Sequence, residues 1–579
     1  MLVRRGRAGA SERPPYNCHR DLGPYAGVDA FLADLARDHP RQAARHSVEL
    51  HSIVPALNPA LNPARTTAAD EQPIRFHPVR RTAALSFGAA EFVAACAVRR
   101  PLTVHFVHAD AADETTAGLL ATLTRRLAST PMALHLHDGG APEPDVESRP
   151  THLRAMLGDS LARGFYHHAV RTARRGRAAV TPETDLALWW SFTTGLATAL
   201  AAVGHAVEAL QLYAEARAVT DDPKITMSAA YSTAMLYARH LPPAQQDPAL
   251  ARQWLETALH LADGITDERR RVVSTIFYEQ GIALLDSREG RADEALELVN
   301  SGLVKLSTVL GADERRQDQA RLRHNRAQLH LALGKAAEAL ADLDDVIAYD
   351  PENCEYYVDR AALHRAAGRT SAALGDYAAA IRLGPHLPEA YYNRATLYEE
   401  TGRSGAARED LRRVLAIDPA HLDARVALAN LHLARGDLAA AEACVRSAPA
   451  ERRDAPALLC TLGLIRSERG ALDEADDLLT RALDAAPGLA EAWTNRAAVR
   501  FERGDAAAAV ADLDRAVVLS TAAEPRFNRA TALMRLERWG EAADDLTAAL
   551  AVPGLDAKLR RDLRAGLNRC RAHASSRRR

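Results

Sequence analysis

The sequence predicts a mainly α-helical protein, an α-solenoid of paired helices that follows a small N-terminal α/β domain. Three observations support this fold class. One motif recurs every 34 residues through the C-terminal half, only 5% of the residues are aromatic while alanine is abundant, and residues 1–150 alternate helical with short apolar segments. Because 579 residues are too many for one hydrophobic core, an array of repeats or several domains is expected.

Charge and cysteine content narrow the class of protein. The net charge of -2 provides no global field toward nucleic acid or an anionic membrane, so neither is predicted as a partner. The six cysteines are scattered without a C-x-x-C pair, which argues against a disulfide framework or a structural zinc site. The start of the chain leads into no apolar signal region, and the apolar stretch Gly195–Val203 is shorter than the roughly 18 residues of a membrane span. We expect a cytoplasmic protein that needs no cofactor.

The N-terminal region is expected to hold a flexible segment over 1–24 and a small α/β domain over 25–145. Helical patterns alternate there with short apolar segments that are typical of strands, which favours a parallel layer. Residues 55–73, rich in Pro and Ala, are predicted to form a loop or linker. The expected helices are Val28–Ala36, Ala83–Val98 and Thr115–Leu127, and the strand-like segments are Ser47–Val54, Leu102–Val107 and Met132–Leu136.

The run from Leu102 to His137 resembles the stretch around the second acidic motif of signal-transducing (STAND-type) NTPases that end in helical repeats. The resemblance implies that Asp110 matches the acid that holds magnesium, with Asp113 and Glu114 nearby. The phosphate-binding pattern G-x-x-x-x-G-K-[ST] is absent from the chain. We therefore predict a docking domain without a P-loop and not an active NTPase.

Four histidines on the two expected strands raise the alternative of a transition-metal cluster. His105, His108, His135 and His137 could meet Asp110 if the strands are neighbours. The chain contains 22 histidines, so chance recurrence is the preferred interpretation and no metal site is predicted. Because no nucleophile or catalytic motif can be assigned, the chain is predicted not to be an enzyme.

The repeated unit is two helices joined at a glycine. A small residue stands seven positions before each turn, and an alanine five positions after it, with apolar residues at helical spacing between them. Four units end at a proline, which stops the second helix. The turn positions are Gly334, Gly368, Gly402, Gly436, Gly470 and Gly504, followed 33 residues later by Glu537.

This order of small residue, Gly, Ala and Pro resembles the tetratricopeptide repeat family over seven units at 320–556. The resemblance implies an α-solenoid superhelix with a concave face that holds a protein or peptide. Turns at Gly164, Gly204 and Gly290 predict four longer helix pairs over 151–319, one of them degenerate near Gln246–Trp254. Ala557–Ala574 is apolar on one face, which predicts a capping helix over 557–575.

Five repeats carry an arginine before the small residue and an aspartate sixteen positions after the arginine. In the two other repeats, Leu428 and Leu462 replace the arginine, and Cys444 and Leu478 replace the aspartate. This covariation within one chain predicts structural ion pairs between the two helices of a unit. The predicted pairs are Arg326–Asp342, Arg360–Asp376, Arg394–Asp410, Arg496–Asp512 and Arg529–Asp545.

The resemblance also implies peptide-binding residues on the first helices. Asparagine at this place in the family lies on the concave face, where an amide can bond a peptide backbone of any sequence. The alternative is that the amides make only local bonds or face solvent. Arginines on the same helices, Arg321 and Arg500 among them, suit an acidic ligand, as would Arg323, His324, Arg425 and Arg526. The predicted asparagines are Asn325, Asn393, Asn495 and Asn528.

Three functions are compatible with these features. The first is a scaffold or adaptor whose concave groove holds a protein or peptide ligand. The second is a regulator related to repeat-bearing NTPases that lacks nucleotide hydrolysis, and the third is a non-catalytic subunit of a biosynthetic or peptide-modifying complex. No DNA-binding helix-turn-helix is recognisable in the sequence, so the first hypothesis is preferred.

Overall fold

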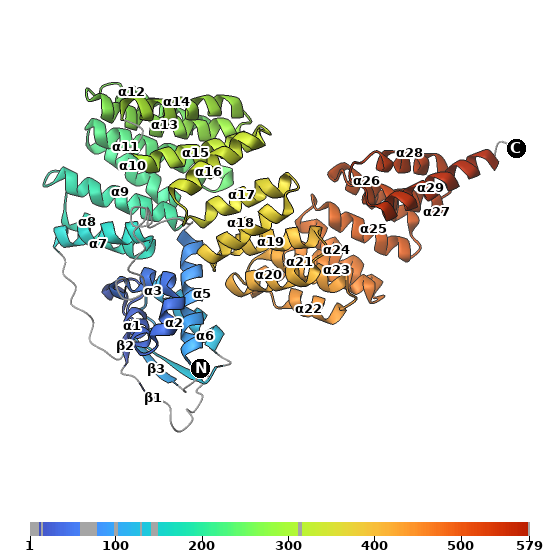
Figure 1. Cartoon of the computed structure of the whole chain (residues 1–579), viewed down its shortest axis with the longest axis horizontal. Coiled ribbons are helices and arrows are strands. Elements are labelled where there is room, and N and C mark those ends of the chain that lie inside the picture. The colour runs from blue at the N-terminus through green and yellow to red at the C-terminus, as the bar shows by residue number, and fades with distance from the viewer. Residues whose placement is uncertain are drawn as a thin grey trace. The chain divides into compact units, whose positions relative to one another are not determined.

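The computed structural model describes residues 11–12, 15–57, 78–97, 102–127, 130–139, 149–310 and 315–576. It divides into two compact units, 1–390 and 391–579, and helix α19 (Pro388–Glu400) spans the division. Helices dominate, and the fold class is that of an α-solenoid with a small α/β domain at its N-terminus (Figure 1). No helix in the described part of the chain is long and apolar enough to cross a bilayer.

The N-terminal domain contains a small parallel sheet. Strand β3 is central, β4 pairs with one of its edges, and β1 and β2 pair with successive parts of the other. The helices of the domain bury Phe31, Leu35, Phe92 and Leu123 in one core with Phe106 of β3. The elements are β1 Ser11–Glu12, β2 Tyr16–Asn17, α1 Val28–Asp38, α2 Pro40–Arg45, α3 Ser47–Ile53, α5 Pro78–Ala97, β3 Leu102–Val107, α6 Glu114–Leu127 and β4 Met132–His137.

Two expectations for this domain are wrong. Ser47–Val54 is not a strand, because Leu50, Ile53 and Val54 are buried at the i, i+3, i+4 spacing of a helix face and form α3. The segment 1–24 is not flexible over 15–24, because Tyr16 and Cys18 are buried in the core and β2 pairs with β3. Residues 1–10 and most of the expected linker, 58–73, lie outside the described residues.

Six helix pairs complete the first unit, each with a first and a second helix that pack along their length. Their apolar faces form cores shared between neighbouring pairs, as expected when one pair cannot bury its own face. The pairs are α7 Pro150–Arg163 with α8 Tyr166–Ala179, α9 Leu186–Ala202 with α10 Ala206–Val219, α11 Pro223–Met235 with α12 Pro248–Ala262, α13 Glu268–Arg288 with α14 Ala292–Val309, α15 Arg316–Ala332 with α16 Ala336–Tyr349, and α17 Cys354–Ala366 with α18 Thr370–Leu383.

The second unit continues the same pattern to the C-terminus. Its last core is closed by α29, which buries Leu563, Leu567 and Cys570 against the final pair. After α19 its helices are α20 Ser404–Ile417, α21 Leu422–Leu433 with α22 Leu438–Arg446, α23 Pro456–Glu468 with α24 Leu472–Ala485, α25 Ala490–Glu502 with α26 Ala506–Leu519, α27 Ala523–Arg535 with α28 Trp539–Leu550, and α29 Ala557–Ser576.

The turn glycines adopt the left-handed conformation that lets the chain reverse between helices. Gly334 has φ 71°, and the N–H of Lys335 bonds the carbonyl oxygen of His330 at 2.8 Å, which caps the C-terminus of α15. At the last turn Glu537 has φ 58° and the same capping bond is made by Arg538 to Leu533. Glu537 thus follows the same backbone path as the turn glycines, in a left-handed conformation that is unfavourable for a residue with a side chain.

The N-terminal domain contacts two separate places of the solenoid in the first unit. At α7 and α8 it is held by polar contacts described below, and Tyr25 packs edge-on against Phe165. The other contact is the loop between α18 and α19, in which His386 packs against Phe87 and lies beside Gly88 in the middle of α5. There His386 Nε2 lies 3.0 Å from Glu49 Oε1, and both side chains are about 95% buried. Burial raises the pKa of Glu49, but the hydrogen bond and the charge of His386 outweigh burial and lower this pKa overall.

Candidate functional site

The predicted arginine–aspartate pairs are bidentate in all five repeats. In each, Nε and one terminal nitrogen of the arginine donate to the two carboxylate oxygens at 2.6–2.9 Å, joining the first helix to the second. The aspartates are buried, and the hydrogen bonds raise the pKa of Arg326, Arg360, Arg394 and Arg529 above the usual value. These residues hold the repeat together and do not present free charge to a ligand.

The two exceptional repeats use different contacts. Leu428 and Leu462 occupy the arginine position, and in the first of these repeats Arg425 ties the same two helices by donating to the carbonyl oxygen of Cys444 at 2.8 Å. Arg425 is only 3% exposed, and burial lowers its pKa. The expectation that Arg425 faces an acidic ligand is therefore wrong, because its side chain lies between the helices.

Two of the four predicted asparagines make hydrogen bonds to the preceding first helix. The amide nitrogen of Asn325 donates to Gln280 Oε1 at 3.3 Å, and that of Asn495 lies 3.4 Å from Cys460 Sγ. In both cases the partner stands one position before the equivalent site of the previous repeat. For Asn393 and Asn528 no hydrogen-bond partner is found in the part of the chain that the structure describes. The position therefore serves inter-repeat contacts in some repeats and leaves the amide available in others.

The predicted arginines also differ in their surroundings. Arg500 donates to Asp476 at 3.0 Å and pairs with Asp512 at 3.0 Å, so its charge is used inside the second unit. Arg321 is half-exposed, lies 4.8 Å over the ring of Phe277 and pairs with Asp318 at 2.7 Å. Of these two arginines, Arg321 lines the cavity described next.

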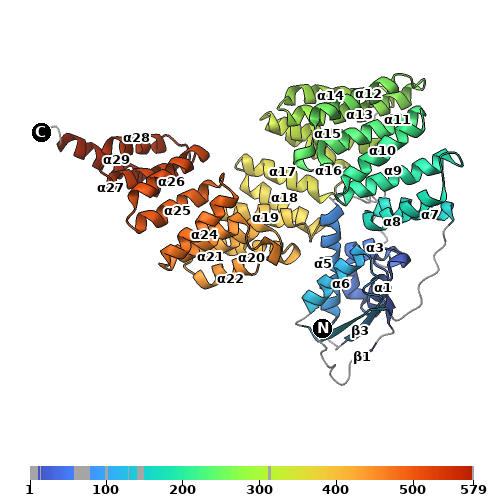
Figure 2. The same cartoon turned by 180° about the vertical axis from the view of Figure 1, so that it is seen from behind.

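A cavity of about 440 Å³ lies between the first helices of the third, fourth and fifth pairs. Helices α11, α13 and α15, which are neighbours in both views, supply most of the lining (Figures 1 and 2). Its floor is apolar, and its polar margin includes Arg321 and Asn325, two residues that the sequence predicted to bind a ligand. This margin also includes Arg239, Gln280, Asp318 and Gln328, which the sequence analysis did not single out. The volume falls in the range of roughly 300–1,000 Å³ that ligand pockets occupy.

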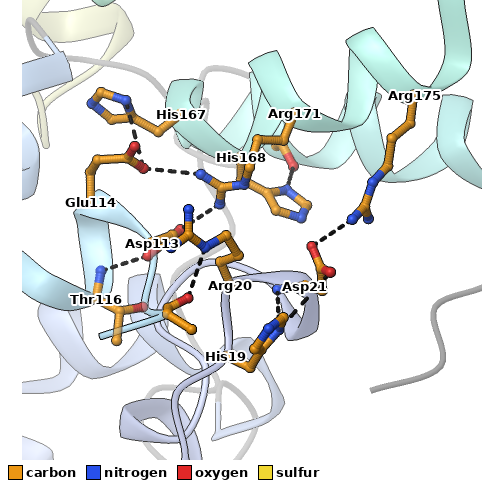
Figure 3. Close-up of polar contacts among 12 residues, drawn as sticks. His19, Arg20, Asp21, Asp113, Glu114, Thr116, His167, His168, Arg171 and Arg175 are labelled. Atoms are coloured by element: carbon orange, nitrogen blue, oxygen red, sulfur yellow. Dashed lines mark hydrogen bonds and ion pairs between the residues drawn. The ribbon is translucent and has the colours of Figure 1, made fainter. Parts of the chain in front are cut away.

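The acidic residues of the NTPase-like stretch anchor the first helix pair (Figure 3). Asp113 accepts the N–H of Thr116 at 2.7 Å, as an N-cap does, and pairs with Arg171 of α8, which also donates to Glu114 at 3.0 Å. Burial raises the pKa of Glu114, but its backbone hydrogen bond and the charges of His167 and Arg171 outweigh this and lower it. Asp110 accepts the N–H of Gly139. The geometry gives Asp113 and Glu114 a structural role.

The histidines of β3 and β4 stack side by side on the sheet. His105 lies opposite His135 in the strand register, with ring centroids 4.7 Å apart, and His105 Nδ1 is 2.9 Å from His137 Nε2. Parallel rings at this spacing do not aim their nitrogens at one point. Among the described residues no group of three or more His, Cys, Asp or Glu side chains is arranged to hold a metal ion.

Models of the tetratricopeptide repeat match residues 324–388, 402–459 and 460–524. These ranges contain part of α15, helices α16 to α18 and helices α20 to α26, and the left-handed glycine turns recur in them every 34 residues. No curated protein matches the chain.

Solved structures similar to parts of the chain include several repeat proteins. A tetratricopeptide repeat protein from Parabacteroides merdae is 19% identical over 43% of this chain and 98% of its own, with a TM-score of 0.38. Yeast Tom70 is 14% identical over 74% of this chain and 96% of its own, with a TM-score of 0.38. YrrB, titled a repeat protein with an unusual peptide-binding site, is 20% identical over 31% of this chain and 92% of its own, with a TM-score of 0.25. The three matched ranges, with their helix pairs and left-handed glycine turns, are thus tetratricopeptide repeats.

Proposed function

We propose that this protein is a non-catalytic scaffold or adaptor of the cytoplasm that binds a protein or peptide on the surface formed by its first helices, hereafter the first-helix surface. The observation that carries the proposal is the cavity between α11, α13 and α15, which combines an apolar floor with a polar margin. Repeat proteins of this kind use such extended surfaces to hold partners. The cavity offers what a peptide needs, an apolar recess for a side chain and polar groups for its backbone.

The asparagine position of the first helices also supports the proposal. The arginine–aspartate pairs are satisfied within each unit and leave this position as the polar group available to a ligand. The amides of Asn393 and Asn528 on first helices have no partner among the described residues, and a buried ligand backbone could satisfy them. Partner binding is therefore assigned to the first helices.

The proposal is tested by native affinity purification with mass spectrometry. The test variant replaces Asn325, Asn393, Asn495 and Asn528 by Ala and should lose a partner that wild type retains. The control variant replaces four exposed residues of second helices by Ala and should retain the partner. The control residues are Glu297, Asp484, Arg515 and Asp544. Both variants must melt like wild type. A partner kept by the first variant and lost by the control would refute the assignment.

A further inference from the structure

We propose that the cavity between α11, α13 and α15 is an anchor site for a peptide segment in which a bulky apolar side chain stands next to a carboxylate. The inference rests on the proposed function and specifies the ligand chemistry of one place on the first-helix surface. It depends on three features of the cavity: the composition of its floor, the charge of its margin, and a π-helical turn that brings one of its arginines to the margin.

The floor selects an apolar side chain. Met235 of α11, Ile276 and Phe277 of α13 and Leu322 of α15 line it, and no charged group lies among them. A ligand side chain such as Leu, Met or Phe would bury most of its surface there, which contributes roughly 1.5–3 kcal/mol when burial is complete. A polar side chain would lose its water without finding partners on the floor.

The margin carries an excess of positive charge. Asp318, the one acidic residue of the lining, is shared by Arg321 at 2.7 Å and Arg315 at 2.6 Å. Arg239 is exposed, and no carboxylate pairs with it among the residues that the structure describes. The two arginines and one aspartate of the lining leave a formal charge of +1 at the margin. Electrostatic complementarity therefore favours an acidic residue beside the buried side chain.

A π-helical turn places Arg239 at this margin. Helix α11 ends in the π-helical segment η3 (Leu236–His240), in which the N–H of Leu241 bonds the carbonyl oxygen of Leu236 at 3.0 Å. Such turns are rare, add one residue relative to an α-helix, and occur frequently at functional sites. One residue corresponds to about 100° of rotation around a helix axis, so a regular α-helical continuation would direct Arg239 elsewhere. The π-helical turn at the end of α11 thus directs Arg239 toward the cavity.

A random dodecapeptide display library tests the inference when it is selected on the full chain and the recovered peptides are synthesised for fluorescence anisotropy. We expect the peptides to carry Leu, Ile, Met or Phe within two positions of Asp or Glu. Each should bind at least tenfold more weakly to the double variant Arg239→Gln/Arg321→Gln, and its affinity should fall as salt rises. Arg515→Gln/Arg561→Gln removes the same charge from exposed sites of the second unit and is the control that should leave affinity unchanged.

Each contrary result has a definite meaning. Peptides that bind the Arg239/Arg321 variant as tightly as wild type, or that lack the paired apolar and acidic residues, would overturn this inference and leave the proposed function standing. Phe277→Ala provides a second readout, because it should weaken binding of the apolar anchor. Recovery of no peptide would also overturn the inference, whereas the proposed function is tested separately by the partner purification.

Discussion

The bidentate pair between Arg394 and Asp410 allows the energetic role of the repeated ion pairs to be measured. Arg394 on α19 donates to both oxygens of Asp410 on α20 at 2.8 Å, and the side chains are 19% and 7% exposed. The chain itself supplies the apolar alternative, because Leu462 and Leu478 occupy the equivalent positions two repeats later. Replacing both charged residues by Leu therefore reproduces a solution already present in the same solenoid.

The single and double substitutions should behave very differently. Asp410→Leu leaves the guanidinium of Arg394 without a partner in a largely water-excluded site, and Arg394→Leu leaves the carboxylate alone, so each should cost about 3–5 kcal/mol. The double variant removes both desolvation penalties and gains apolar contact, so its stability should fall within about 1 kcal/mol of wild type. The coupling free energy between the two sites is then at least about 5 kcal/mol.

A double-mutant cycle on the local stability of α19 and α20 provides the assay. Solenoids unfold by segments, so native-state hydrogen exchange of the two helices is preferable to a single global transition. Both single variants should show faster exchange in α19 and α20, while the double variant restores protection. If the double variant loses as much protection as the two single variants combined, Arg394 and Asp410 contribute independently to stability. The structural interpretation of the covariation is then refuted.

Three further outcomes follow from particular residues. Glu537→Gly should raise the free energy of unfolding by about 1 kcal/mol in urea denaturation, because φ 58° strains any side chain. Gly88→Leu should release the N-terminal domain from the solenoid, because a Cβ there would overlap Glu49 Cγ and lie 2.7 Å from His386 Nε2, the two partners of the buried contact, and faster hydrogen exchange in α5 would report it. The hydrogen bond of Arg466 lowers the pKa of Glu442 to about 2, so wild type should lose stability as pH falls from about 4.3 toward 2, and Glu442→Gln should lack this loss.

Each of these outcomes has a matched control. Glu537→Ala keeps the strain and should bring no gain, so an equal gain from Ala and Gly would contradict the conformational argument. Gly118→Leu on α6 places its side chain in open space, and a similar release by that variant would show that helix disruption alone is responsible. For Glu442 the direction of the pH dependence is decisive. A carboxyl group whose pKa is lower in the folded state stabilises the folded protein at pH values above the pKa of the unfolded state. A free energy of unfolding that rises on acidification would therefore contradict the argument.

The sequence was sufficient to predict the regular repeats and their internal contacts. Helix pairs repeat every 34 residues, so the turn glycine and the arginine–aspartate pair recur in register and can be recognised against one another within one chain. Gly334 reveals a left-handed turn because only glycine enters that conformation without strain. The contact between Arg394 and Asp410 could be predicted because the equivalent arginine and aspartate are both replaced in the same two repeats.

Features that depend on the packing of irregular segments could not be predicted. Ser47–Val54 is a mostly apolar run of eight residues, and the apolar pattern of so short a segment fits both a strand and a short buried helix. Arg425 lies among other first-helix cations in the sequence, and its burial depends on a carbonyl oxygen that no pattern reveals. Arg239 lines the cavity from the π-helical turn at Leu236–His240, whose backbone bonds have no sequence signature, so this residue was not predicted.

The most direct test of binding on the first-helix surface is site-specific photo-crosslinking in cells. A photoreactive amino acid replaces Gln328, which is exposed on α15 at the cavity margin, or Val304, which is 60% exposed on the second helix α14. The account predicts a discrete crosslinked partner at position 328 that disappears in the Arg239→Gln/Arg321→Gln background, and none at position 304. A partner crosslinked at 304 and not at 328 would contradict it.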